Sequence, residues 1–217
     1  MARSIVAYVD ETLDNARLGP VHKRVLAIIT AGLFFDVIDF IILGSLVPDM
    51  LRTHFATPAG IGTVGSATLL GLFLGALGQG ELTDRFGRKT VFQLAVACYS
   101  LVTIAAALAP SIGWLVVGRF VAGVALGAAS PLCFAYAAEY SQKRIRGRVT
   151  AFMQFVGGAC VWPLGTLLAL ALRDTLGWRG VWIVIGVCGL VLFLFTFVVD
   201  SVARAAVAGT GARRGAR

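Results

Sequence analysis

Three ionisable residues lie inside segments that are otherwise apolar enough to cross a bilayer. The stretch LFFDVIDFIIL, residues 33–43, places Asp36 and Asp39 in the first such segment, and Arg119 lies in the fourth. An ionised group at the bilayer centre costs about 2.5–3.5 kcal/mol on insertion scales, so such groups usually face a bundle interior or a watery cavity. The three residues are therefore candidates for moving protons or binding an ion.

The spacing of the two acids indicates what chemistry they could do. Asp36 and Asp39 are three residues apart on one helix face, where their charges repel, and this repulsion favours a state in which one of them carries a proton. At about 1.5 Å of rise per residue, Asp39 lies roughly 12 Å and Arg119 roughly 8 Å below the same surface, so their side chains can meet. Protonating the acid of such a pair would release the cation for an anionic substrate. In the alternative interpretation the three residues only hold helices together, although two acids and one base leave a surplus carboxylate.

The composition indicates an all-α membrane protein. Of 217 residues, 58% are hydrophobic and 14% charged, and the mean hydropathy is +0.86. Because a sheet with open edges is excluded from lipid, runs of about 20 apolar residues predict helices. We expect a six-transmembrane-helix bundle over residues 25–199, with spans near 25–47, 61–79, 91–109, 114–136, 149–172 and 180–199. Residues 1–24 form a cytoplasmic segment, either a surface amphipathic helix or a frayed terminus, and residues 200–217 form a cytoplasmic, disordered tail.

The orientation follows from the distribution of Lys and Arg between the connections. Three cations, Arg52, Arg173 and Arg179, lie on one side, whereas the N-terminal segment, the second and fourth connections and the tail carry nearly all the others. The positive-inside rule then predicts a multi-pass protein of the inner or plasma membrane with both termini in the cytoplasm. This division of the +8 net charge among short membrane-flanking segments does not favour nucleic acid as a partner.

Small residues predict where two helices pack closely. Gly71 and Gly75 recur at i, i+4 in the second span, and Gly123 and Gly127 follow Arg119 at the same spacing in the fourth. Pro131 continues that ladder and predicts a kink that opens backbone groups towards a cavity.

No residue pattern favours a catalytic centre. Each of the four cysteines lies inside an apolar run without CxxC spacing, which supports neither a disulfide framework nor a zinc site. The two histidines, His22 and His54, lie outside the predicted spans. We therefore expect no metal, no cofactor and no enzymatic activity.

Four motifs resemble the major facilitator superfamily. The connection GELTDRFGRKT is similar to the signature between that family's second and third helices, and GRFVAGVALG to its fourth-helix pattern. AEYSQKRIRGR resembles the next cytoplasmic loop of the sugar-porter-like and metabolite or aromatic-acid proton symporter branches, and FFDVIDF resembles the first-helix D-x-x-D of the aromatic-acid symporters. These matches cover most of residues 25–199.

The resemblance implies a mechanism in which two six-helix bundles rock about a central site. Asp36, Asp39 and Arg119 would then serve proton coupling or substrate binding. A cytoplasmic latch would comprise Gly80, Asp84, Arg85, Gly87, Arg88, Glu139, Arg144 and Arg146, although positive loops also orient any membrane protein.

The family normally has twelve helices, whereas six are predicted here, so the chain would be one half of a major facilitator fold. We expect a proton-coupled symporter of a small organic acid or related metabolite, with an anionic substrate. Its partners would be protons, the lipid bilayer and a second six-helix half, from a copy of itself or from a separate chain. A truncated, transport-inactive membrane protein or an assembly subunit is the alternative.

Overall fold

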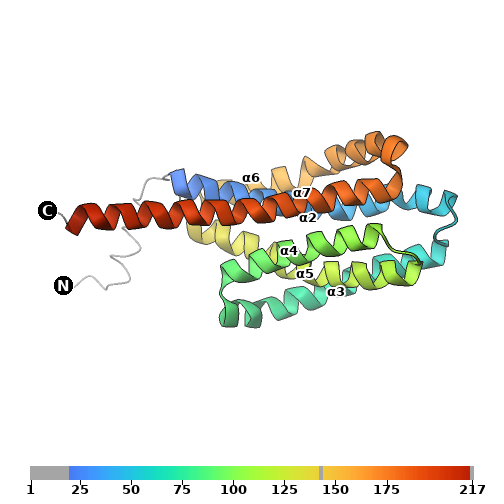
Figure 1. Cartoon of the computed structure of the whole chain (residues 1–217), viewed down its shortest axis with the longest axis horizontal. Coiled ribbons are helices and arrows are strands. Elements are labelled where there is room, and N and C mark those ends of the chain that lie inside the picture. The colour runs from blue at the N-terminus through green and yellow to red at the C-terminus, as the bar shows by residue number, and fades with distance from the viewer. Residues whose placement is uncertain (1–19, 142–143, 216–217) are drawn as a thin grey trace.

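The chain folds into a bundle of long α-helices. The structure is a computed structural model that describes residues 20–141 and 144–215. In chain order the elements are α2 (Pro20–Arg52), α3 (Pro58–Phe86), α4 (Arg88–Ala107), α5 (Ile112–Tyr140), α6 (Arg146–Gln154), the π-helical turn η1 (Phe155–Ala159) and α7 (Val161–Gly215). No strand occurs within those two ranges, and Figure 1 shows the helices running side by side along one long axis.

Five helical stretches of the described chain are long and apolar enough to cross a membrane, and the last of them is divided in two. Four are α2 to α5, and the remaining apolar stretch, Arg146–Thr196, is 51 residues long. That stretch reverses direction at Gly177, whose φ of 65° and ψ of 173° are non-helical. In Figure 1 the two limbs of α7 on either side of this reversal run in opposite directions. Glycine populates positive φ without the steric cost that a Cβ would bring. The predicted six-helix bundle is therefore confirmed.

The fifth crossing segment contains a π-helical turn that has a local cause. Pro163 has no backbone N–H, so the carbonyl of residue 159 loses its usual helical donor. In η1 the N–H of Cys160 donates to the carbonyl of Phe155, five residues earlier, at 3.0 Å, where an α-helix would use the carbonyl of residue 156. Single π turns of this kind are a recognised way for a helix to absorb such an interruption.

The α3 and α5 helices touch at their backbones through glycines. A Cβ added to Gly71 or Gly75 would fall on main-chain atoms of α5, and one added to Gly123 or Gly127 would fall on main-chain atoms of α3. The predicted close approach of these two helices is thus present. It fixes α5, which also carries Arg119, relative to the rest of the bundle.

The two ends of the chain differ from the central bundle in what the structure describes. Residues 1–19 of the predicted cytoplasmic segment 1–24, expected to be either an amphipathic helix or a frayed terminus, lie outside the described residues. The expectation of a disordered tail at 200–217 does not match the structure, because α7 continues as a helix to Gly215 and extends beyond the other helices in Figure 1. Ala and Arg have high helix propensity and no proline follows residue 199, so a composition interpreted as low complexity also suits a helix.

Arg179 joins three connections at one end of the bundle. Its Nη2 donates to the carbonyl of Ala109 at 3.1 Å. Its guanidinium carbon lies 5.4 Å from the ring centroid of Phe55 and 4.9 Å from that of Trp178, and the two rings are themselves 4.7 Å apart. This contact clamps the α2–α3 connection and the end of α4 against the reversal at Gly177.

We expect Arg179→Leu to lower the free energy of unfolding in detergent by about 1–2 kcal/mol, the sum of one cation–π contact and one hydrogen bond. Arg85→Leu is the control, because the Arg85–Glu81 pair is 3.9 Å long with side chains 73% and 78% exposed and such pairs contribute little. Chemical denaturation of both variants measures the difference, and equal midpoints would contradict the clamp.

Candidate functional site

The two charged residues predicted to meet inside the membrane form a buried ion pair. Asp39 lies in the middle of α2 and Arg119 in the first half of α5. Arg119 Nη1 donates to Asp39 Oδ2 at 2.7 Å, and the side chains are 1% and 0% exposed, respectively. The Arg119 guanidinium carbon also lies 5.8 Å from the centroid of the Trp182 ring on α7. The pair thus joins α2, α5 and α7.

The second acid has a different partner and a different environment. Asp36 Oδ2 accepts a hydrogen bond from the Ser130 hydroxyl on α5. Both residues are partly exposed, whereas Asp39 and Arg119 are fully buried. The two acids, one helical turn apart, therefore differ in their surroundings: Asp36 is partly exposed and bonded to Ser130, whereas Asp39 is fully buried and paired with Arg119.

The acids lie between two apolar cores. One cluster, which includes Leu33, packs around the first half of α2, and the other, which includes Ile38 and Ile42, packs around its second half. Asp36 and Asp39 fall at the boundary between them. Because both neighbouring regions are apolar, solvent screens the charges of the two acids little. Loss of the partner of either acid would therefore be strongly destabilising.

Several polar atoms of this region remain unsatisfied by the described protein groups. They are Asp39 Oδ1, Arg119 Nε and Nη2, Trp182 Nε1, Thr103 Oγ1 and the hydroxyl of Tyr99. Ser130, Trp182 and Thr103 are not among the site residues predicted from the sequence. Ser130 has a detectable signal, because it is a hydroxyl directly before Pro131 in an apolar span. For Trp182 and Thr103 the sequence carries no such signal.

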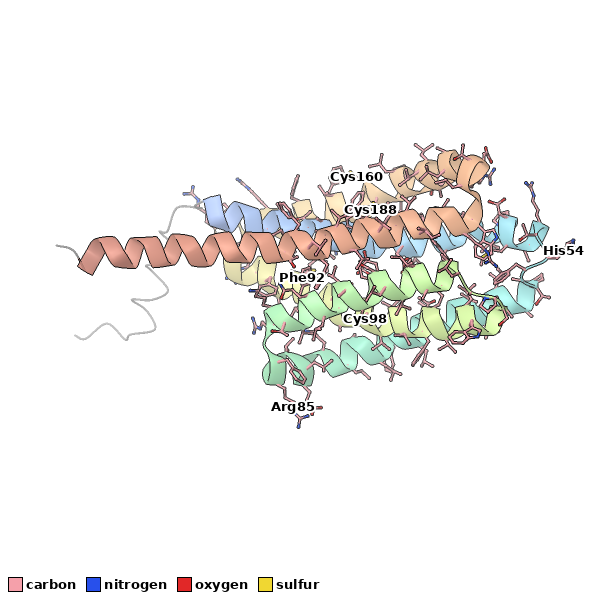
Figure 2. The ribbon with its side chains drawn as sticks, viewed as in Figure 1. His54, Arg85, Phe92, Cys98, Cys160 and Cys188 are labelled. Carbon is pink, nitrogen blue, oxygen red and sulfur yellow. The ribbon has the colours of Figure 1, made fainter. Side chains whose placement is uncertain are left out.

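The proposed latch residues lie at one end of the bundle, but the segment is more helical than predicted. Gly80, Asp84 and Arg85 belong to the last turns of α3, which ends at Phe86, and Arg88 begins α4. The sequence predicts a connection over residues 80–90, but Gly87 alone separates α3 from α4. Gly87 has a φ of 79°. Arg85 extends away from the bundle in Figure 2.

The second set of latch residues lies near the start of α6. Arg144 is exposed, and Arg146, the first residue of α6, is exposed as well. Glu139 belongs to α5, but its side chain lies outside the part of the chain that the structure describes. A pairing of Glu139 with the other latch residues thus stays a prediction.

The cysteines do not gather into a site. Cys98, Cys133, Cys160 and Cys188 are all free thiols, and Figure 2 shows Cys98 on a different helix from Cys160 and Cys188. Over residues 20–141 and 144–215, no group of three or more His, Cys, Asp or Glu side chains could hold a metal ion.

A comparison with family models identifies the fold family. The model described as "Major Facilitator Superfamily" matches residues 29–215, which include the buried pair and all of the spans except the first few residues of the first one. The chain belongs to the major facilitator superfamily. The relationship that the four sequence motifs indicated is therefore confirmed, and the chain is a multi-pass integral membrane protein.

Curated relatives of this major facilitator protein are named as transporters. The niacin transporter NiaP of Acinetobacter baylyi is 33% identical over 77% of the chain and 38% of its own length. The gallate transporter of Pseudomonas putida is 34% identical over 85% and 41%. The 4-hydroxybenzoate transporter PcaK of Pseudomonas aeruginosa is 31% identical over the same shares. The chain thus spans about two fifths of the length of these relatives, and their names as transporters agree with a protein that is not an enzyme.

Solved structures support the same fold. The proton:xylose symporter XylE bound to 6-bromo-6-deoxy-D-glucose matches with a TM-score of 0.70 and 21% identity, over 82% of this chain and 44% of that one. A partially occluded, inward-open XylE from E. coli matches with the same TM-score over 82% and 49%. The likeness covers the six-helix bundle, and at this identity it establishes the fold alone.

Proposed function

We propose that this chain supplies the N-terminal six-helix half of a proton-coupled symporter for a small organic acid or related metabolite. The observation that carries the proposal is the Asp39–Arg119 pair, buried at 0–1% exposure, beside a second acid bonded to Ser130. Relatives named for gallate and 4-hydroxybenzoate favour a carboxylate substrate. The transport cycle would require a second half, supplied by another copy or by a separate chain.

Protonation would work as a switch through electrostatics. When Asp39 takes up a proton, the Asp39–Arg119 ion pair loses its charge attraction, and a fully buried guanidinium without a counter-charge is strongly unfavourable. The bundle must then rearrange, or an anion must replace the carboxylate. Arg119 has almost no exposed surface, so recognition of a substrate anion requires this opening first.

Asp36 would be the acid that exchanges protons with the aqueous face. It is partly exposed and accepts a hydrogen bond from Ser130, which orients its carboxylate. The proton taken up on one side is released on the other, so each acid returns to its starting state. One proton moving through 100 mV releases about 2.3 kcal/mol, which can concentrate a substrate roughly 50-fold.

The positive-inside rule supports an orientation with both termini and the latch in the cytoplasm. The start of α2 and the end of α7 lie at the same end of the bundle in Figure 1. This is the end expected to carry Asp84, Arg85 and Arg88, which would meet the second half when the cytoplasmic side closes.

Uptake of radiolabelled 4-hydroxybenzoate by membrane vesicles that contain the chain tests the coupling. We expect uptake to collapse with an uncoupler and to fall at least about tenfold in Asp36→Asn and Asp39→Asn, because each removes a titrating group that a proton relay needs. Asp174→Asn is the control, since that carboxylate is 80% exposed at the Gly177 reversal and should leave uptake unchanged. Uptake that persists in all three conditions would contradict coupling, and vesicles without any uptake would favour a transport-inactive protein.

A further inference from the structure

Thr103 of α4 is a buried threonine whose hydroxyl has an unusual arrangement. A threonine inside a helix commonly donates to the carbonyl four residues earlier, as Thr68 does to Val64 at 2.8 Å. Thr103 is equally buried, at 1% exposure against 0% for Thr68. Its Oγ1 nevertheless has no hydrogen-bond partner among the described protein groups. This hydroxyl is therefore available to a group outside its own helix.

The contact between α4 and α5 places Thr103 at the level of the ion pair. A Cβ on Gly118 would lie 3.4 Å from Ala106 Cβ and 3.8 Å from Val102 Cγ1. Arg119 follows Gly118 directly, so it enters the bundle at the height of residues 102–106. Thr103 lies within that turn of α4.

The contact between α4 and α7 places Trp182 at the same level. A Cβ on Gly186 would lie 2.9 Å from the carbonyl oxygen of Ser100 and 3.2 Å from the amide of Ile104. Trp182 precedes Gly186 by about one helical turn. Because the two helices run antiparallel here, Trp182 lies level with the residues of α4 that follow Ile104, next to the turn that contains Thr103.

The unsatisfied atoms form a complementary set. Asp39 Oδ1 can accept, whereas Arg119 Nε and Nη2 and Trp182 Nε1 can only donate, and a threonine hydroxyl can do both. All four side chains are at most 1% exposed. Buried polar groups in native proteins are satisfied, and where protein partners are lacking an ordered water with about three hydrogen bonds usually satisfies them.

We propose that Thr103 and Trp182 hold internal water against the free atoms of the Asp39–Arg119 pair and so act as positioning residues for it. The water accepts from Arg119 and Trp182 and donates to Asp39 Oδ1, with Thr103 completing the set. In this arrangement α4 and α7 both support the pair. If the proposed function is correct, a proton can reach Oδ1 through this water while Oδ2 still binds Arg119.

Three substitutions test whether the Thr103 hydroxyl binds internal water or makes no hydrogen bond at all. Thr103→Val keeps the shape and removes the hydroxyl, and Thr103→Ser keeps the hydroxyl and removes a methyl group. In the purified chain in detergent, we expect Thr103→Val to lower the thermal midpoint by about 2–4 °C and Thr103→Ser to lower it less. Thr68→Val is the matched control and should change the midpoint little, because its hydroxyl bonds only to its own helix.

A double variant tests whether Trp182 shares the same water. Trp182→Phe removes the indole N–H, and we expect its effect on the midpoint to be smaller in the Thr103→Val background than in the wild type. Strictly additive effects would overturn the shared site. A Thr103→Val chain as stable as or more stable than the wild type would overturn the proposal, since removal of an idle buried hydroxyl is neutral or favourable. These measurements involve no transport, so their outcome is independent of the uptake assay.

Discussion

Replacing Asp39 or Arg119 singly with leucine should lower the free energy of unfolding by about 3–5 kcal/mol, whereas replacing both together should restore most of that loss. Each single substitution leaves one member of a 2.7 Å ion pair buried at 0–1% exposure without its counter-charge. The double variant removes both charges and fills the space with apolar groups. Buried ion pairs replaced in this way often leave stability unchanged.

The two single variants should also differ from each other. In Arg119→Leu, the Asp39 carboxylate can avoid the cost of a buried, unpaired charge by taking up a proton. In Asp39→Leu, the guanidinium has no such route, because arginine remains charged in proteins. We therefore expect Asp39→Leu to be the less stable of the two, and the double variant to be more stable than either.

Denaturation of the purified chains in detergent measures this order. Arg173→Leu is the control, because its contact with Asp49 is 3.9 Å long and partly exposed, and it should cost about 0–1 kcal/mol. Single variants as stable as the wild type would contradict a paired, charged site. A double variant no better than the worse single one would show that the residues contribute packing rather than charge. The double variant should remain without uptake in either case, because the titrating acid has been removed.

The buried pair could be predicted from the sequence because the physics leaves few choices. Only three charged residues lie inside the spans predicted from the sequence, and a charge in lipid requires a partner. The depths of Asp39 and Arg119, counted from the ends of their spans, bring them to a similar level. The six crossing segments can also be predicted from the sequence, because the thickness of the bilayer sets their lengths.

The remainder of the site depends on the register between helices, which apolar periodicity does not specify. Arg119, Trp182 and Thr103 come to similar heights because of the levels at which Gly118 of α5 and Gly186 of α7 meet α4. Similarly, α3 extends through most of the predicted second connection, because charged residues such as Glu81 and Arg85 are good helix formers and only Gly87 adopts a positive φ. Polarity predicted where the chain leaves the apolar region, but not where the helix ends.

Adding one methyl group at Gly75 should destabilise the bundle, whereas adding it at Gly78 should stabilise it. A Cβ at position 75 would fall on the carbonyl oxygen of Val124 and lie 3.0 Å from the amide of Ala128. These are backbone atoms of α5, which cannot move aside as a flexible side chain can. We expect Gly75→Ala to cost about 1–3 kcal/mol, the usual range for overpacking.

Gly78 is the matched control because it lies on the same helix, one turn later, and a Cβ there would meet nothing within 4 Å. Gly78→Ala should increase the free energy of unfolding by about 0.5–1 kcal/mol, because alanine is the better helix former. The opposite signs of two identical substitutions, measured by denaturation in detergent, separate helix propensity from interhelical contact. Equal effects at both positions would contradict the backbone contact between α3 and α5. A displaced α5 would also move Arg119 relative to Asp39, so Gly75→Ala should weaken the ion pair although neither charged residue has changed.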